Sequence, residues 1–285
     1  MKTTKGKEEN LKERLDKLLV AQGHFDTRER AKKAIMAGLI QVNEQIKDKA
    51  GDLVDTEATI LIKGSDMPYV SRGGLKLEKG LATFSLPVAG NTFIDIGSST
   101  GGFTDCLLQN GAKKVYSVDV GYGQLDWKLR NDERVVSMER TNFRHLTGDD
   151  FPEMVDGTVM DVSFISIIKL FDAIQAVMKP GALGIWLIKP QFEAGRGRIG
   201  KNGVVREKKI HEDVLLQVLT AIDQHGFTVK GLDYSPIQGP KGNIEFLVFV
   251  ENKQTDSEFE WSQKIENVVK IAHENCRKKK EPLAE

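Results

Sequence analysis

Short apolar segments alternate with amphipathic helical patterns between residues 93 and 250, and this alternation restricts the fold more than any other feature. Seven segments have the length and composition of buried strands: 93–96, 115–120, 135–138, 159–162, 183–188, 228–233 and 244–250. Helical patterns occupy most of the intervals: 70–84, 103–110, 124–130, 165–178 and 206–225. The alternation predicts an α/β fold with a doubly wound, mostly parallel seven-stranded sheet and helices on both faces. The last two strands lack a helix between them, so we expect them to pair antiparallel.

A smaller module precedes this pattern. Apolar residues recur at helical spacing between Leu11 and Leu19, and a second helix begins after Asp26 or Thr27, either of which can cap it. Gly38 stands where a left-handed helix end is expected. Two short strands follow, at 40–42 and 59–62. The pattern predicts a compact αα-ββ module.

Composition shifts suggest the domain boundaries. We expect the small domain to cover residues 1–63 and a linker to cover 64–70, where glycine and proline interrupt the periodicity. The larger α/β domain then covers 71–255. The charged C-terminal segment, 256–285, is expected to form one helix.

Composition limits the partners and the compartment. The 41 basic residues equal the 41 acidic ones, so only local patches can indicate a polyanionic partner. Cys106 and Cys276 stand far apart without metal-ligand spacing, which argues against a disulfide framework and a metal site. The chain has no apolar stretch of about 20 residues, so we expect a cytoplasmic protein without a membrane partner.

A glycine-rich turn follows the first strand of the larger domain. It reads Asp95-Ile96-Gly97-Ser98-Ser99-Thr100-Gly101-Gly102-Phe103, and Asp119 ends the next strand. The glycine spacing is neither the GxGxxG of dinucleotide folds nor a phosphate loop. Glycines at this edge of a parallel sheet allow close approach to a ligand, and a carboxylate there can accept hydrogen bonds from a ribose. The alternative is an ordinary turn whose glycines serve packing alone.

Four charged residues interrupt apolar segments of the same domain. They are Lys76, Asp161, Lys189 and Glu245. Asp161 and Lys189 follow adjacent strand candidates, at the edge where such a sheet binds its ligand. A charge this close to a core must be paired or functional, and for each residue alone a structural ion pair is as good an explanation as catalysis.

The motifs together resemble a known family. The glycine turn is similar to motif I of the class I S-adenosylmethionine methyltransferases, which have a Rossmann-like sheet. Lys76, Asp161, Lys189 and Glu245 match, in chain order, the tetrad of the FtsJ-like ribose 2'-O-methyltransferases. From about Lys12 to Val250 the chain resembles the TlyA (hemolysin A) family of ribosomal RNA methyltransferases. Thr27-Arg28 stands where that family commonly has Ser-Arg.

The resemblance implies a reaction, a cofactor and a substrate. The cofactor would be S-adenosylmethionine, and the substrate a ribose 2'-hydroxyl, of cytidine, in ribosomal RNA or ribosomal subunits. It also implies a set of cofactor-binding residues: Asp95, Gly97, Ser98, Ser99, Gly101, Gly102, Phe103, Asp119, Asn142 and Asp161.

The catalytic role of Lys189 has two forms. A neutral Lys189 could accept the proton of the 2'-hydroxyl, because burial and a neighbouring cation lower a lysine's pKa. A charged Lys189 would instead orient the hydroxyl and stabilise negative charge on its oxygen, while Glu245 holds Lys76 or the substrate. Nearby carboxylates oppose the pKa shift, so the sequence leaves both forms open.

Basic residues suggest two RNA-binding regions. The small module resembles the RNA-binding domain named after ribosomal protein S-four, and residues 189–209 carry seven Lys or Arg against two Glu. The second segment suggests a cationic lid over the catalytic edge, with a charged crossover loop as the alternative. Phe192 and Phe143 could stack on a base, although core packing suits both. The candidate RNA contacts are Arg14, Lys17, Arg28, Arg30, Lys32, Lys33, Arg72, Arg196, Arg198 and Lys201.

Other functions compete with this interpretation. A base methyltransferase would share the cofactor half, but the chain lacks the Asn/Asp-Pro-Pro-aromatic motif common in base nitrogen methylation. A membrane-active hemolysin is suggested only by the family's second name. A non-catalytic RNA-binding assembly factor would not need the intact tetrad. The sequence leaves the oligomeric state open.

Overall fold

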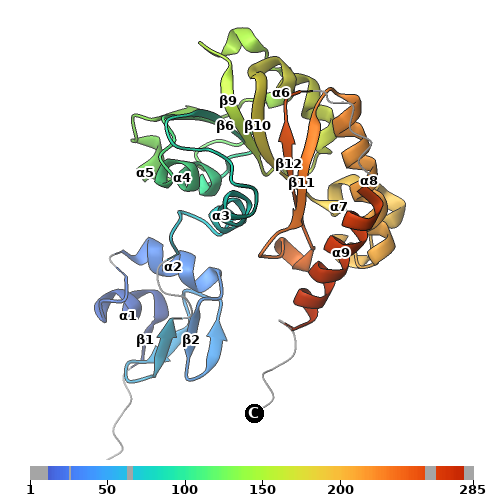
Figure 1. Ribbon diagram of the computed structural model, residues 1–285. Coiled ribbons are helices and arrows are strands. Elements are labelled where there is room, and N and C mark those ends of the chain that lie inside the picture. The colour runs from blue at the N-terminus through green and yellow to red at the C-terminus, as the bar shows by residue number, and fades with distance from the viewer. Residues whose placement is uncertain (1–11, 26, 63–66, 254–260, 279–285) are drawn as a thin grey trace, which may run out of the picture. The chain divides into compact units, whose positions relative to one another are not determined.

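The chain divides into two compact units, Met1–Met67 and Pro68–Glu285. The computed structural model describes residues 12–25, 27–62, 67–253 and 261–278, and Figure 1 shows the elements of each unit.

The N-terminal unit contains two short helices and five short strands among its described residues. Strands β1 and β4 pair antiparallel, and β2 lies between β3 and β5 in a second sheet. The elements are β1 (Lys12–Arg14), α1 (Leu15–Ala21), α2 (Arg28–Met36), β2 (Ile40–Val42), β3 (Gln45–Lys47), β4 (Leu53–Asp55) and β5 (Ile60–Ile62).

The expected helices of this unit are present, with one changed boundary. Helix α1 begins at Leu15, whereas residues 12–14 form a strand against β4; Leu11 lies outside the described residues. The apolar part of the buried face of α1 consists of Leu15, Leu18 and Leu19. The residues before them pair with β4 instead of extending the helix. The side chain of Thr27 caps α2, and Gly38 follows it with φ +71°, both as predicted.

The C-terminal unit is built on a seven-stranded sheet with the strand order β11-β12-β10-β9-β6-β7-β8. Strands β6 to β10 are parallel, and β12 runs antiparallel to both β10 and β11. This arrangement confirms the predicted doubly wound, mostly parallel sheet and the antiparallel final pair. The strands are β6 (Thr92–Ile96), β7 (Lys114–Val118), β8 (Val135–Met138), β9 (Val155–Met160), β10 (Met178–Ile188), β11 (Thr228–Tyr234) and β12 (Phe246–Glu251).

Helices cover both faces of this sheet (Figure 1). Side chains alternate between the faces along each strand, so Phe93 packs with α3, α4 and α5, and Ile94 packs with α6, α8 and α9. The helices are α3 (Gly73–Phe84), α4 (Gly102–Gln109), α5 (Trp127–Arg130), α6 (Phe171–Val177), α7 (Pro190–Glu193), α8 (Lys208–Gln224) and α9 (Trp261–Lys278).

Four of the five helices predicted for this domain are shorter than expected, and α3 and α8 lose only residues at their ends. The segment 124–130 is helical only from Trp127, where Asp126 caps it. The segment 165–178 begins as a 3₁₀ turn at Ile167–Leu170 and becomes α6, and Met178 already belongs to β10. Asn252 explains the early strand, because its side-chain amide donates to the carbonyls of Met178 and Lys179.

The C-terminal segment forms the expected helix, α9, over Trp261–Lys278, and this helix also contributes to the core, which the sequence did not predict. Its buried side chains repeat at helical spacing and face α8 and β11. They are Ile265, Val268, Val269 and Ala272.

Candidate active site

The glycine turn connects β6 to α4 at the carboxyl edge of the parallel strands. Gly97 has φ +82° and Gly101 has φ +93°, values that favour glycine. A Cβ at Gly97 would lie 3.0 Å from the carbonyl oxygen of Asp161, and one at Gly101 would overlap Leu129. The predicted glycines are therefore required by both conformation and space.

Asp119 lies directly after β7 and holds the turn in place. Its Oδ2 accepts a hydrogen bond from the amide of Ser99 at 2.8 Å, and its Oδ1 accepts one from the amide of Gly121 at 2.7 Å. Each carboxylate oxygen can accept a second hydrogen bond. Asn142 belongs to the same region, because the amide of Thr141 donates to the carbonyl of Asp119.

Asp95 is fully buried beneath the turn. Its Oδ2 accepts hydrogen bonds from the amide and the hydroxyl of Thr104, at 2.9 and 2.7 Å. Burial raises the pKa of this carboxyl to about 7, although the hydrogen bonds from Thr104 oppose the shift. Asp95 fixes the start of α4 and is not exposed to a ligand.

Other residues of the turn differ in exposure. Ser98 is buried and Ser99 is exposed. Phe103 is 3% exposed and packs in the core with Leu77, so it supports the turn from behind. Gly102 lies against the start of α3, because a Cβ there would overlap the hydroxyl of Ser71.

The fold brings the four interrupting charges to one edge of the sheet. Asp161 directly follows β9 and Lys189 directly follows β10, which run parallel. Glu245 precedes β12, whose first residue pairs with Ile188 at the end of β10. Because β12 is antiparallel to β10, its beginning lies at the edge where the other strands end. Lys76 reaches the same place from the first turns of α3.

Two carboxylates and two ammonium groups form a continuous cluster. Lys76 Nζ lies 3.0 Å from Asp161 Oδ2 and 2.8 Å from Glu245 Oε2. Lys189 Nζ lies 2.5 Å from Asp161 Oδ1 and 2.9 Å from the hydroxyl of Ser163. The side chains of both lysines are 9% exposed, and that of Asp161 is 17% exposed. The cluster is thus nearly buried, and its charges balance.

The cluster keeps two of its members ionised. Burial alone would lower the pKa of Lys76, but the carboxylates of Asp161 and Glu245 outweigh it and raise the pKa. Burial alone would raise the pKa of Asp161, but Lys76 and Lys189 outweigh it and lower the pKa. Gln191 lies nearby, with its amide nitrogen 3.4 Å from Glu245 Oε1.

An aromatic residue that the sequence interpretation missed lies beside this cluster. Phe164, three residues after Asp161, is 92% exposed and has φ +66°. Its ring centroid is 5.3 Å from that of Phe192, which in turn lies 6.0 Å from Lys189 Nζ. Phe143 is buried in the core and cannot stack on a base. An exposed aromatic in a left-handed conformation is unusual, but the sequence alone gave no sign of either property.

The basic segment after β10 consists of short turns. Arg198 forms an ion pair with Asp213 of α8. The amide of Val205 donates to the side chain of Asn243 at 3.0 Å, which ties the end of the segment to the loop before β12. The side chains of Arg196 and Lys201 lie outside the part of the chain that the structure describes.

The candidate RNA contacts of the N-terminal unit are mostly engaged in ion pairs. Arg14 and Arg28 contact the two oxygens of the buried Asp16, at 3.0 and 2.8 Å. The hydrogen bond from Arg14, together with a smaller effect of the one from Arg28, lowers the pKa of Asp16 to about 2 against the effect of burial. Lys32 pairs with Glu29 at 2.8 Å and Lys17 with Glu13 at 3.9 Å. Arg30 and Lys33 are exposed on α2.

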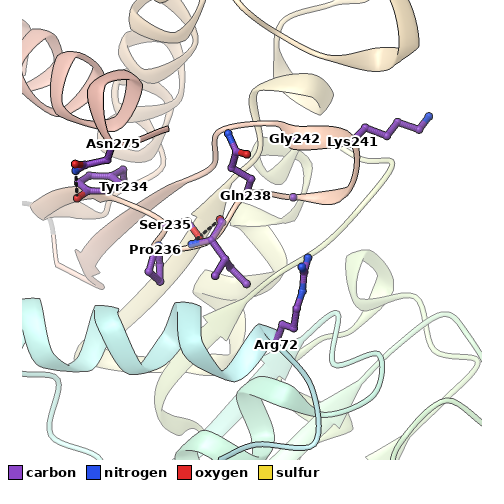
Figure 2. Close-up of a pocket in the computed structure, with 10 residues that line it drawn as sticks. Arg72, Tyr234, Ser235, Pro236, Gln238, Lys241, Gly242 and Asn275 are labelled. Carbon is purple, nitrogen blue, oxygen red and sulfur yellow. Dashed lines mark hydrogen bonds between the residues drawn. The ribbon is translucent and has the colours of Figure 1, made fainter. Parts of the chain in front are cut away.

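A pocket of about 430 Å³ opens beside the cluster, between Arg72 at the start of α3 and the loop that joins β11 to β12 (Figure 2). Sequence reasoning named Arg72 but none of the loop residues. They are Tyr234, Ser235, Pro236, Ile237, Gln238, Gly239, Lys241 and Gly242, and Asn275 of α9 completes the lining.

Two features are absent from the described residues. No group of three or more His, Cys, Asp or Glu side chains there could hold a metal ion. Within the same residues, no helix combines the length and apolar character needed to cross a bilayer.

The fold and the site are those of a methyltransferase that carries a second domain of an RNA-binding class. The chain belongs to the FtsJ-like methyltransferase family, which matches residues 69–252, and residues 13–60 match the S4 domain.

Similar proteins support the narrower resemblance to the TlyA (hemolysin A) family. YqxC of Bacillus subtilis, named a candidate rRNA methyltransferase, is 50% identical over 96% of this chain and 99% of its own. The 16S/23S rRNA (cytidine-2'-O)-methyltransferase TlyA of Mycobacterium tuberculosis is 40% identical over 85% of this chain and 91% of its own. The solved structure of a candidate hemolysin from Streptococcus thermophilus covers 95% of this chain and 99% of that chain, with TM-score 0.76 and 50% identity.

Proposed function

We propose that this protein transfers a methyl group from S-adenosylmethionine to the 2'-hydroxyl of a cytidine ribose in ribosomal RNA, in the cytoplasm. The single observation that carries the proposal is the cluster of Lys76, Asp161, Lys189 and Glu245 at the edge of the sheet beside the glycine turn. Relatives named as ribosomal RNA (cytidine-2'-O)-methyltransferases supply the substrate class.

The glycine turn and Asp119 fit the cofactor. The backbone at Gly97 lies too close to Asp161 for a side chain, so the turn presents main chain at this position. The carboxylate of Asp119 keeps one acceptor position on each oxygen, which suits the two hydroxyls of a ribose. Bound there, S-adenosylmethionine supplies an electrophilic methyl group on a sulfonium sulfur.

Lys189 is the group that we place against the target hydroxyl. As an ammonium it has three hydrogens, of which one is directed to Asp161 and one to Ser163. The third can donate to the 2'-oxygen and hold a lone pair of that oxygen in line with the methyl carbon. The hydroxyl proton passes to solvent water as the oxygen takes the methyl group, and the same hydrogen bond from Lys189 stabilises the negative charge that develops on the oxygen. The geometry thus favours the orienting role over the proton-accepting role.

Lys76 and Glu245 position the other two members. Lys76 is held between two carboxylates and stays charged, so it fixes the carboxylate plane of Asp161. The fixed Asp161 in turn sets the direction of the Lys189 ammonium. We assign Lys76 and Glu245 positioning roles and Lys189 the direct contact with the substrate.

Phe164 supports an unpaired nucleotide as the substrate. Its exposed ring stands three residues after Asp161 and 5.3 Å from the ring of Phe192, which lies beside Lys189. Stacking on an aromatic ring is a common way to hold a base out of RNA. This placement makes Phe164 a better candidate for stacking than Phe192 or Phe143.

The test is methyl transfer from tritiated S-adenosylmethionine to ribosomal RNA and to ribosomal subunits, followed by mapping of the label and alkaline hydrolysis. We expect the labelled linkage to resist alkali, because cleavage requires a free 2'-hydroxyl. Label at an alkali-sensitive linkage would indicate base methylation. No transfer to either substrate would favour a non-catalytic RNA-binding factor.

A further inference from the structure

The pocket between Arg72 and the β11–β12 loop has a fixed shape. The hydroxyl of Ser235 donates to the carbonyl of Ile237 at 2.7 Å, and the amide of Gly239 donates to the carbonyl of Asn243 at 3.0 Å. On the other side, the amide of Asn275 donates to the hydroxyl of Tyr234 at 2.7 Å (Figure 2). The loop is therefore held by its own hydrogen bonds and by α9.

The pocket adjoins the charged cluster on two sides. Arg72 precedes Lys76 by one turn of α3. The backbone of Gly239 lies directly against Glu245, since a Cβ there would overlap the Glu245 carboxylate. A molecule in the pocket would thus be a direct neighbour of whatever contacts Lys76 and Glu245.

The strand order places the β11–β12 loop, which forms most of the pocket lining, on the side of the cluster away from the cofactor turn, whereas Arg72 stands beside that turn. The turn follows β6 and Asp119 follows β7, whereas the pocket lies at the ends of β11 and β12 that face the same edge. The cluster lies between them, on β9, β10 and β12. The pocket can therefore be filled while the glycine turn holds the cofactor.

The lining combines cations with an apolar wall. Arg72 and Lys241 are exposed, and within the described part of the chain neither has an ion-pair partner. Arg72 points from α3 toward the loop, with the amide of Gln238 above it (Figure 2). Pro236 and Ile237 supply half-buried apolar surface. Cations, an amide and an apolar wall in a pocket of about 430 Å³ suit one nucleotide.

We propose that this pocket binds the nucleotide adjacent to the methylated one, with Arg72 and Lys241 contacting its phosphate and the Pro236–Ile237 wall contacting its base. The inference rests on the proposed function, because it takes RNA as the ligand and the cluster as the position of the target ribose. It adds a second nucleotide to the recognised sequence and explains how the chain would fix the direction of the RNA strand across the cluster.

The test compares the full-length protein with the Arg72→Glu, Lys241→Glu double variant. Transcribed ribosomal RNA is the probe, with its Kd measured by fluorescence anisotropy at several salt concentrations and its KM measured in methyl transfer. Lys113→Glu is the matched control, since Lys113 is an exposed cation just before β7, at the opposite edge of the sheet. The Kd for S-adenosylhomocysteine and the melting temperature show whether the fold is kept.

We expect the double variant to raise the RNA KM on the order of tenfold and to reduce the salt dependence of log Kd by about 2, one for each lost phosphate contact. Lys113→Glu and the affinity for S-adenosylhomocysteine should stay within twofold of wild type. An unchanged KM and salt slope, or an equal loss in Lys113→Glu, would overturn the pocket assignment while methyl transfer continues. Wild-type RNA binding without methyl transfer would instead refute the proposed function, and the salt slope would still decide the pocket.

Discussion

Lys189 and Asp161 face each other at 2.5 Å from the ends of two neighbouring parallel strands. The sheet brings the two residues together, because β9 and β10 pair up to Met160 and Trp186, and β12 pairs with Ile188 directly before Lys189. The side chain of Lys189 is held further by Ser163, whose hydroxyl accepts its hydrogen bond at 2.9 Å.

Replacing Lys189 with alanine should remove the ammonium group that contacts Asp161 and Ser163. We expect methyl transfer to fall by about 10²-fold to 10³-fold or more, the usual loss when one group that stabilises charge in a transition state is deleted. Affinity for S-adenosylhomocysteine should change less than twofold, because the glycine turn and Asp119 are untouched. Lys179→Ala, at the other end of β10, is the control. Full activity of Lys189→Ala would refute the role of this lysine.

Phe164→Ala should weaken RNA binding without affecting stability. The ring is 92% exposed, so its loss removes almost no core packing. Stacking on one base is worth about 1–3 kcal/mol, which corresponds to roughly a 5-fold to 150-fold increase in the RNA KM. Phe164→Trp should retain the wild-type KM. If alanine and tryptophan give the same KM in methyl transfer, the ring does not stack on the substrate.

Asp95 should make the C-terminal unit more stable in mild acid. Its pKa is about 7 in the folded chain and about 4 in an unfolded one, so the folded state binds more protons between these values. The contribution of Asp95 to the free energy of unfolding therefore falls as the pH rises from 4 to 7, by up to about 1.4 kcal/mol per pH unit.

Urea unfolding followed by tryptophan fluorescence measures this effect, because all three tryptophans belong to the C-terminal unit. Asp95→Asn keeps an acceptor for Thr104 and removes the titration. The difference between wild type and variant should therefore change with pH in the stated direction. A difference that is constant from pH 5 to pH 8 would contradict the raised pKa.

Asp16→Asn should destabilise the N-terminal unit. The variant loses the ionic hydrogen bonds to Arg14 and Arg28, at a cost of about 2–3 kcal/mol. Hydrogen exchange of α1 and α2 should accelerate accordingly. Glu29→Gln, which removes only an exposed pair with Lys32, should leave the exchange rates of both helices nearly unchanged, because exposed ion pairs contribute little to stability.

The lowered pKa of Asp16 also predicts that the stability of the N-terminal unit depends on pH. The pKa of Asp16 is about 2 in the folded chain, below its ordinary value near 3.8, so its contribution is complete above pH 4 and is lost as the pH falls toward 2. If the protection of α1 from hydrogen exchange, relative to the unfolded chain, is unchanged down to pH 2, Asp16 does not stabilise the unit.

The sequence predicted the arrangement of the sheet because strand periodicity and helix spacing are local properties. It also indicated Asp161 and Lys189 as neighbours, since residues that end adjacent parallel strands must meet at one edge. Glu245 could be placed only by resemblance, because its position depends on β12 lying between β10 and β11, which no local pattern specifies.

The sequence did not predict the exposure or the partners of individual side chains. Phe103 and Phe164 both lie in the segments that follow strands of the sheet, the first at the start of α4 and the second in the loop after β9, yet one is 3% and the other 92% exposed. Arg14 and Arg28 remain candidate RNA contacts, and their pairing with the buried carboxylate of Asp16 was not predicted from the sequence. Such outcomes depend on long-range packing, which composition and spacing do not encode.

The antiparallel direction of β12 has a consequence for synthesis of the chain on the ribosome. Lys76 finds one carboxylate partner once β9 has been translated, but its second partner arrives only with the strand that completes the sheet. A nascent chain that stops short of residue 245 carries the glycine turn, Asp161 and Lys189, yet lacks the second carboxylate that pairs with Lys76. The four-residue cluster therefore assembles only late in translation, after every other strand of the sheet has been made.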